Sequence, residues 1–326
     1  MRSLILLTVL SLTSHVARAE PDLPGLDVFI DEMVEEHQFD AAELRAAFAE
    51  VEVKDSILKA IARPAEKAKP WYEYRNIFLD QARIHAGAEF WQEHADTLKA
   101  AEQTYGVPAE VILAILGVET RFGGNVGSFR VIDALSTLAF QYPPRSKFFR
   151  SELKHFLILT REEAMPPLEP IGSYAGAMGL GQFMPSSYRA YAIDFDADGH
   201  RDIWTNPVDA IGSIANYLHE HGWRAGESIV HQTTAANDQI PEALIKRGLK
   251  PSVSRDEAAA AGLSLDNLPA DAEVFNVFSL EQRHDNELWL GRQNFYAITR
   301  YNHSQMYAMA VVDLAEAIRA RYERIQ

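Results

Sequence analysis

The segment "VPAEVILAILGVETRFGG", Val107 to Gly124, is an almost unbroken apolar run with one carboxylate, Glu119, close to its end. Pro108 suits the first turn of a helix, and the final two glycines would end one. Side chains three and four positions apart share a helix face, so Glu119 lies on the same apolar face as Ile115 and Leu116. The segment therefore predicts a buried helix with an acid on its buried side.

This acid has two interpretations. Burial disfavours the ionised carboxylate and raises its pKa, which suits a general acid working near neutral pH. Alternatively, Glu119 forms a buried ion pair with Arg121, Arg130 or Arg145. The helix by itself favours the ion pair, because a perturbed carboxylate only hints at function. The rest of the sequence has to decide between the two.

Most of the remaining chain has the apolar spacing of helices. The segments with this pattern are 26–51 with a break near Phe39 and Asp40, 95–106, 146–164, 206–223 and 307–325. Between them, residues 226–292 differ in character, because "EVFNVFSL" and "ELWLG" have strand composition and turn residues separate them. We expect a mainly α protein with a small β-containing module, whose number of strands the sequence leaves open.

The composition is that of a folded protein, with 47% hydrophobic and 24% charged residues. The formal net charge of −15 argues against nucleic-acid partners, which require a basic surface, and against docking on anionic lipid. We therefore expect no nucleic-acid partner and no membrane anchor.

The first residues, "MRSLILLTVLSLTSHVARAE", combine a basic start, a short apolar stretch and the small residues Ala17 and Ala19 around Arg18. This order is typical of a signal peptide, and we expect residues 1–19 to be removed after Ala19. The alternative is an ordinary N-terminal helix. The chain has no cysteine, so it has neither disulfides nor a lipid-attachment cysteine. The sequence thus predicts a soluble exported protein, in a bacterial periplasm.

A glycine-rich segment, "IGSYAGAMGLGQFMPSSY", follows the helix at 146–164. Gly176, Gly179 and Gly181 do not have the spacing of a dinucleotide-binding turn, and no phosphate-binding Lys-Ser or Lys-Thr pair follows. We therefore expect a turn-rich connection and no organic cofactor. Ser173 and Gln182 would be polar groups beside a cleft, where they could bond amide or hydroxyl groups.

A second loop, "DFDADGHRDIW", carries Asp194, Asp196 and Asp198 at alternate positions before Gly199. This spacing matches the first half of an EF-hand loop, in which carboxylates converge on Ca²⁺. The main-chain carbonyl of His200 would be a further ligand. Thr205 occupies the position where an EF-hand has its last glutamate, so Asp209 would have to close a longer loop. We predict a structural Ca²⁺ site, the alternative being an acidic surface turn.

Four motifs in the same order strongly resemble the lytic murein transglycosylase B family: "ILGVETRFGG", "SYAGAMGLGQFMPSSY", "DADGHRDIWTNPVDAIGSIANYL" and "ITRYNHSQMYAMAV". The similarity extends from "WYEYRNIFL" to the last helix. It implies a goose-type-lysozyme-like helical core, an N-terminal helical region and a small β-containing insertion. On this basis we divide the chain into an N-terminal helical region 20–105, a catalytic core 106–225 with the EF-hand-like loop, a β-containing module 226–292 and a C-terminal segment 293–326 that returns to the core.

The resemblance implies that Glu119 is the single catalytic acid and base. It also implies a set of residues that line or border the sugar cleft: Ser173, Gln182, Met178, Tyr74, Arg145, Tyr217, Tyr301, Asn302 and Tyr307. The implied Ca²⁺ ligands are Asp194, Asp196, Asp198, the His200 carbonyl and Asp209. Two departures stand out. The loop at "TNP" is one residue longer than the shortest family version, and Phe148 replaces a tyrosine of some members.

The implied reaction is non-hydrolytic cleavage of the bond between N-acetylmuramic acid (MurNAc) and N-acetylglucosamine (GlcNAc) in peptidoglycan, which leaves 1,6-anhydroMurNAc ends. Two alternatives remain open: a hydrolytic muramidase of the same fold, and a peptidoglycan-binding scaffold without activity. The expected partners are glycan strands and other cell-wall enzymes, and we expect a monomer.

Overall fold

The computed structural model describes residues 22–62, 69–236, 241–266 and 268–326. The expected signal peptide, 1–19, lies outside these residues. Within the described ranges, no helix combines the length and the apolar character that crossing a bilayer requires.

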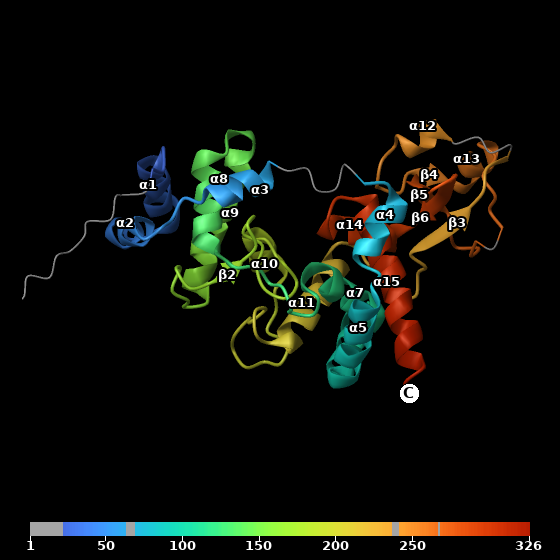
Figure 1. Ribbon diagram of the computed structural model, residues 1–326, viewed down its shortest axis with the longest axis horizontal. Helices are drawn as coiled ribbons and strands as arrows, with labels where there is room; N and C mark the ends of the chain where they lie inside the picture. Colours follow the sequence, from blue (N-terminus) through green and yellow to red (C-terminus); the bar gives the residue numbers. More distant parts are fainter. Residues whose placement is uncertain (1–21, 63–68, 237–240, 267) are drawn as a thin grey trace, which may run out of the picture.

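The described chain is mainly helical, as the sequence predicts, with two small antiparallel sheets (Figure 1). The helices are α1 (Leu26–His37), α2 (Ala41–Ala49), α3 (Asp55–Ile61), α4 (Trp71–Tyr74), α5 (Gln81–Glu93), α6 (Ala95–Tyr105), α7 (Ala109–Thr120), α8 (Val131–Gln141), α9 (Ser146–Glu162), α10 (Pro185–Tyr191), α11 (Pro207–Glu220), α12 (Glu242–Ile245), α13 (Arg255–Ala260), α14 (Gln293–Tyr301) and α15 (Gln305–Glu323). The strands are β1 (Phe129–Arg130), β2 (Ile171–Gly172), β3 (Val230–Thr233), β4 (Val253–Ser254), β5 (Val274–Glu281) and β6 (Asn286–Gly291).

Helix α7 is the buried centre of the fold, as its apolar sequence predicts. It packs against α15, α5, α6 and α11, and most of its side chains are inaccessible to solvent. The helix ends earlier than its glycines suggest, at Thr120. Arg121 and Phe122 follow in the left-handed region, at φ 52° and 57°. Their N–H groups bond the carbonyls of Gly117 and Leu116, both at 3.2 Å, and this bonding pattern closes the helix end.

The N-terminal region that we expected over 20–105 divides into two parts in the structure. Helices α1 to α3 lie with α8 and α9 at one end of the molecule, where Phe29 packs edge to face on Phe48 and Phe140 (Figure 1). Helices α5 and α6 instead cover α7, and α5 also packs on α15. The reason is that the apolar faces of α1 to α3 and those of α5 and α6 pack against different helices. The sequence shows these faces but not what covers them.

The β-containing module has a four-stranded sheet in the order β3-β6-β5-β4, with antiparallel neighbours. The segments "EVFNVFSL" and "ELWLG" form β5 and β6, which confirms both predicted strands. Alternate side chains of β5 point to opposite faces. Phe275 and Val277 enter a second, smaller core, while Phe278 and Leu280 pack on the main core. The sheet therefore fastens the module to the helical part.

Candidate active site

Glu119 lies in the last turn of α7, half-buried, and its carboxylate meets a hydroxyl from the far end of the chain. Tyr307, in the first turn of α15, donates its hydroxyl to Glu119 Oε1 at 2.6 Å. Tyr307 is only 2% exposed. Burial and, after it, the charge of Glu119 raise the pKa of Tyr307 well above its ordinary value. The phenol therefore stays protonated and acts as a donor to the acid.

The three arginines considered as ion-pair partners of Glu119 contact other groups. Arg121 lies 3.5 Å from the carboxylate of Asp80. Arg130 bonds Asp133 at 2.8 Å. The guanidinium of Arg145 lies over the aromatic ring of Phe148, 4.4 Å from its centre. The structure therefore shows each of these three arginines in contact with another group.

Three aromatic side chains form a cluster next to this acid. The ring of Tyr301 lies 4.8 Å from that of Tyr217 and 5.7 Å from that of Phe183. The Tyr301 hydroxyl donates to the carbonyl of Gly181 at 2.5 Å, and the Tyr217 hydroxyl donates to the carbonyl of Arg300 at 2.6 Å. Burial first, and the charge of Glu119 second, raise the pKa of Tyr301. This places Tyr301 within the electrostatic reach of the acid.

The polar residues of the glycine-rich loop hold the loop in shape. The Ser173 hydroxyl accepts the N–H groups of Ala175 at 3.3 Å and Ala177 at 3.0 Å. The Gln182 side-chain amide donates to the carbonyls of Val126 at 3.2 Å and Gly179 at 3.0 Å. Both residues are half-buried, so each has a surface that a ligand could reach.

Met178, which the resemblance places near the sugar cleft, is 0% exposed. Its N–H and carbonyl pair with those of Phe183, at 2.9 Å in both directions. This pairing turns the Met178 side chain into the main core. In this conformation the side chain supports the loop from beneath and does not reach a substrate, which differs from the prediction.

The three other predicted cleft residues occupy different settings. Tyr74, on α4, is 3% exposed and packs against Phe78, and its charge contributes to the raised pKa of Tyr307. Asn302 is half-buried at the end of α14. Arg145 is exposed in the short turn before α9. The structure thus places Tyr301 and Tyr307 within the electrostatic reach of Glu119, and Tyr74 within that of Tyr307.

Sequence reasoning missed Thr120, the neighbour of Glu119. Its side chain is completely buried, and its hydroxyl donates to the carbonyl of Leu180 in the glycine-rich loop at 2.8 Å. The same oxygen accepts the N–H of Gly123 at 3.1 Å. A threonine at the end of a buried apolar helix was the one available signal, because a buried hydroxyl requires partners.

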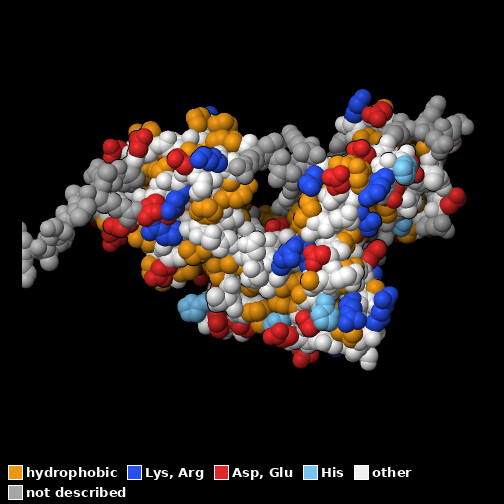
Figure 2. All heavy atoms as spheres, viewed as in Figure 1, with side chains coloured by type: hydrophobic (Ala, Val, Ile, Leu, Met, Phe, Trp, Pro, Cys, Tyr) orange, Lys and Arg blue, Asp and Glu red, His pale blue; other side chains and the backbone are white. Residues whose placement is uncertain are grey.

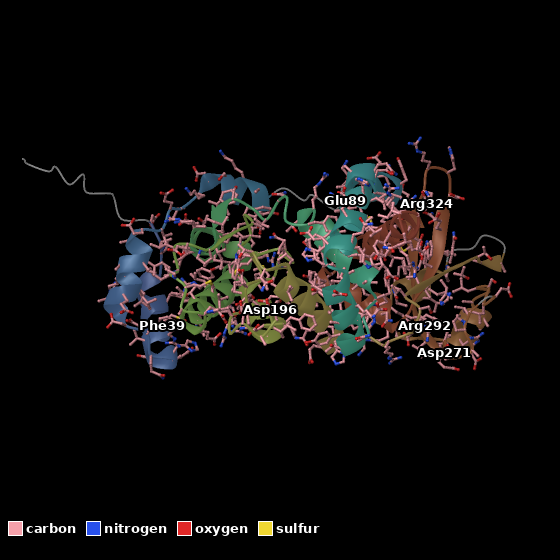
Figure 3. All side chains as sticks on the ribbon, turned by 90° about the horizontal axis from the view of Figure 1, so that it is seen from below. Phe39, Glu89, Asp196, Asp271, Arg292 and Arg324 are labelled. Atoms are coloured by element: carbon pink, nitrogen blue, oxygen red, sulfur yellow. The ribbon has the colours of Figure 1, made fainter. Side chains whose placement is uncertain are left out.

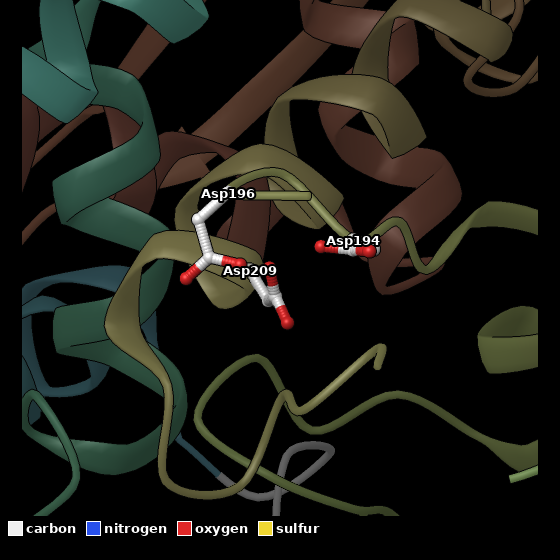
Figure 4. Close-up of side chains that lie close together, drawn as sticks. All are labelled: Asp194, Asp196 and Asp209. Carbon is white, nitrogen blue, oxygen red and sulfur yellow. The ribbon is translucent and has the colours of Figure 1, made fainter. Parts of the chain in front are cut away.

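Two carboxylates of the acidic loop converge with that of Asp209, in the first turn of α11, as Figure 4 shows. One oxygen from each of Asp194, Asp196 and Asp209 lies within 4.8 Å of the others. Asp209 is fully buried and accepts N–H groups from Phe195 and Asp202, both at 2.8 Å. Burial, together with the charges of Asp196 and Asp194, raises the pKa of Asp209. A cation between these oxygens would offset both the burial of the Asp209 charge and the repulsion among the carboxylates.

The rest of this loop departs from the simple EF-hand count. The carboxylate of Asp198 lies outside this three-membered cluster and accepts the N–H of His200 at 2.9 Å. Thr205, in the twelfth position, bonds the side chain of Asp202. Asp209 is the third carboxylate of the cluster, and its role as the closing ligand stays a prediction.

The surface is hollowed between the part of the molecule that carries α8 and α9 and the part that carries α4 and α14 (Figure 2). A mainly helical core whose buried central helix ends on an acid agrees with the lysozyme-like class of glycan-cleaving proteins, to which the comparisons assign the chain. Within that class, the chain belongs to the family described as the transglycosylase SLT domain, which it matches over residues 23–316.

Relatives of known name support this assignment. The chain is 42% identical over 304 residues to the membrane-bound lytic murein transglycosylase B of Escherichia coli (strain K12), covering 90% of this chain and 82% of the relative. The crystal structure of the soluble lytic transglycosylase SltB1 from Pseudomonas aeruginosa is 50% identical, with a TM-score of 0.86 over 91% of this chain and 99% of that one. The Escherichia coli lytic transglycosylase Slt35 in complex with calcium is 39% identical, with a TM-score of 0.85 over 98% of this chain and 100% of that one. These comparisons confirm the resemblance and the lysozyme-like fold.

Proposed function

We propose that this lytic transglycosylase of peptidoglycan cleaves the MurNAc–GlcNAc β-1,4 bond with Glu119 as its single acid and base. The observation that carries the proposal is the half-buried carboxyl at the end of the apolar helix α7, where Tyr307 bonds its Oε1 atom at 2.6 Å. Glycosidases ordinarily need a second carboxylate as nucleophile or base. In the proposed reaction, which uses one carboxylate, the nucleophile is supplied by the sugar itself.

The proposed reaction uses one group twice. Protonated Glu119 donates its proton to the oxygen that joins C1 of MurNAc to C4 of GlcNAc, and the bond between C1 and this oxygen breaks. The C6 hydroxyl of the same MurNAc then attacks C1, while the Glu119 carboxylate takes the hydroxyl proton. The products are a GlcNAc hydroxyl and a 1,6-anhydroMurNAc end, and no water is consumed.

The cleft residues have supporting roles in this proposal. Tyr307 holds the Glu119 carboxyl in one orientation, which matters because proton transfer requires reach and alignment. Ser173, Gln182 and Asn302 offer polar groups to sugar hydroxyl and amide groups. Tyr74, Tyr217 and Tyr301 provide rigid aromatic walls, and Arg145 provides an exposed cation for carboxylates of the peptide stems.

The variant Glu119→Gln tests the proposal on purified peptidoglycan sacculi. We expect at least a thousandfold loss of turnover without loss of fold, because the amide keeps the shape but is neither an acid nor a base near neutral pH. The matched control is Glu110→Gln, in the first turn of the same helix, where the carboxylate bonds Arg319 at 2.9 Å. We expect it to keep full activity.

Mass spectrometry of the wild-type products distinguishes the alternatives. Anhydro ends support the proposal, whereas reducing muramoyl ends would show a hydrolytic muramidase. An intact wild-type protein that binds sacculi without releasing fragments would be the non-catalytic scaffold. Near-normal turnover by Glu119→Gln would remove this residue from the reaction.

We propose in addition that the acidic loop holds a structural Ca²⁺ ion. The donor set fits, because Asp194, Asp196 and the buried Asp209 supply hard carboxylate oxygens that lie within 4.8 Å of one another. Asp198 and the carbonyl of His200 remain the further ligands that the resemblance implies. When bound, the ion would neutralise the clustered charges and fix the loop. Calorimetric titration with Ca²⁺ tests this proposal.

The proposed substrate also determines where the enzyme works. Peptidoglycan strands are the partner, so we infer action in the periplasm, consistent with the signal peptide expected over residues 1–19. The association with other cell-wall enzymes and the monomeric state stay predictions.

A further inference from the structure

The end of helix α7 and the acidic loop are joined through a single residue of the glycine-rich loop, Leu180. Its carbonyl accepts the Thr120 hydroxyl at 2.8 Å. Its N–H donates to the carbonyl of Ile203 at 2.8 Å. Asp202, which precedes Ile203, donates its own N–H to Asp209 at 2.8 Å. A short series of hydrogen bonds thus connects the carboxylate cluster to the residue next to Glu119.

The Thr120 hydroxyl is well suited to a linking role. It has one proton, and two carbonyl oxygens lie within reach: Leu180 at 2.8 Å and Leu116, in its own helix, at 3.3 Å. The shorter of these two bonds joins α7 to the glycine-rich loop. The oxygen also accepts the N–H of Gly123, so the one side chain holds both the glycine-rich loop and the turn that ends the helix.

The contact between the glycine-rich loop and the acidic loop leaves no space for a side chain at Gly179. A Cβ atom there would lie 2.5 Å from the carbonyl oxygen of Ile203. Gly179 also has φ 69°, a conformation that glycine adopts without strain. The backbones of the two loops can therefore approach closely enough for the Leu180 N–H to reach the carbonyl of Ile203. This link, like the one from Thr120 to Leu180, is a single hydrogen bond.

We propose that Thr120 is a positioning residue that, through Leu180, couples the order of the acidic loop to the placement of Glu119. The inference rests on the proposed function for the role of Glu119 and on the proposed Ca²⁺ site for the ligand. Ca²⁺ bound between Asp194, Asp196 and Asp209 fixes the backbone at Asp202 and Ile203. Leu180 and Thr120 then carry this restraint to the end of α7.

Hydrogen exchange with and without Ca²⁺ tests the coupling without any turnover. In the wild-type protein we expect Ca²⁺ to slow exchange of the amides of Leu180 and Gly123. Thr120→Ser keeps the hydroxyl and should keep both responses. Thr120→Val keeps the shape but loses the hydroxyl, so the Leu180 amide should still respond and the Gly123 amide should not.

The control is Thr160→Val, which removes a buried hydroxyl that donates to the carbonyl of Leu157 in its own helix, at 2.9 Å. We expect this variant to respond to Ca²⁺ as the wild-type does. An unchanged Gly123 response in Thr120→Val, or no response of Gly123 in the wild-type, would overturn the coupling. The wild-type measurement tests the coupling even if a variant fails to fold.

Kinetics give the second readout. We expect Thr120→Val to lower kcat by about ten- to a hundredfold with KM nearly unchanged, because it misplaces the acid while leaving the sugar contacts in place. Thr120→Ser should restore most of the rate. Equal losses in both variants would indicate a packing role only. Exchange is also measured in the Glu119→Gln background, so failure of the proposed chemistry and failure of the coupling are separate results.

Discussion

The residue that completes the site is Tyr307, which lies 188 positions beyond Glu119 in the chain. Its hydroxyl is buried, bonded to the acid, and kept protonated by its raised pKa. Such a donor holds the carboxyl in place and adds no charge of its own. The same hydroxyl remains a donor at alkaline pH, so the arrangement does not depend on the ionisation of the phenol.

We predict that Tyr307→Phe lowers the rate of peptidoglycan cleavage by about tenfold, the effect of one lost hydrogen bond to a charged partner. The ring remains in its packing, so the protein should stay folded. Initial rates on sacculi measure the effect, with unfolding midpoints measured alongside. The control is Tyr322→Phe in the same helix, where the ring stacks on Trp91 at 4.3 Å. Equal rates for the two variants would contradict a role for the Tyr307 hydroxyl.

Periodicity could place Glu119 on the apolar face of a helix, because the positions of Ile115 and Leu116 fix that face, but its catalytic role came only from the family resemblance. It could not identify Tyr307 or the bond from Thr120 to Leu180. These contacts join distant elements, and no local pattern encodes which hydroxyl meets which oxygen. The burial of Met178 could not be read from the sequence either. Its backbone pairs with that of Phe183, which turns the side chain inward.

At the scale of elements, the acidic loop is the part whose order should depend on a ligand. Its cluster combines the exposed Asp196 with the buried Asp209. Asp196 also accepts the side-chain amide of Asn206 at 2.9 Å, at the start of α11. The loop therefore joins α10 to α11 through carboxylates that repel one another.

We predict that Ca²⁺ raises the thermal unfolding midpoint and that a chelator reverses the rise. At a hundredfold excess over Kd, binding to the folded state alone stabilises by about 2.7 kcal/mol. Asp196→Asn should remove the effect. Asp256→Asn, which removes the same charge from an exposed position at the start of α13, should preserve it. A midpoint that ignores Ca²⁺ in the wild-type would return the loop to a plain acidic turn.

The sequence predicts the longer elements well and the short ones poorly. The helices at 146–164 and 307–325 appear as α9 and α15 because their apolar stripes are long. Strand β3, "VHQT", has no alternating apolar pattern, and β4 has only two residues. Strands β3 and β4 pair with β6 and β5 through backbone hydrogen bonds, and their own side chains give no pattern that predicts this pairing. The end of α7 was misplaced because Arg121 and Phe122 adopt a conformation usually left to glycine.

At the scale of the whole molecule, two connections join the helical part to the β-containing module, and one buried arginine fastens both. Arg292 lies after β6 and contacts Glu227, at 3.3 Å, in the connection before β3. It also bonds Asp271 at 3.0 Å, and Figure 3 shows these two residues at the same end of the molecule. The side chains of Arg292 and Glu227 are 5% and 9% exposed.

We predict that Arg292→Met destabilises the protein by about 3 kcal/mol, because it leaves the buried Glu227 without this partner. Chemical denaturation measures the loss, and hydrogen exchange in β5 and β6 locates it. The control is Arg247→Gln, which breaks an exposed ion pair with Glu257 and should change little. If both variants unfold at the wild-type midpoint, the arginine does not fasten the module.

The bond between Tyr307 and Glu119 joins two parts of the chain that lie far apart in the sequence. Helix α7 lies in the first half of the chain, whereas α15 follows every other helix and strand that the structure describes. Until α15 packs against α5 and α7, the acid lacks the hydroxyl of Tyr307. A chain that is still being synthesised, or one that ends before Gln305, would carry the acid in an unfinished setting. Under the proposed function, cleavage of peptidoglycan would therefore require the last helix of the chain to be in place.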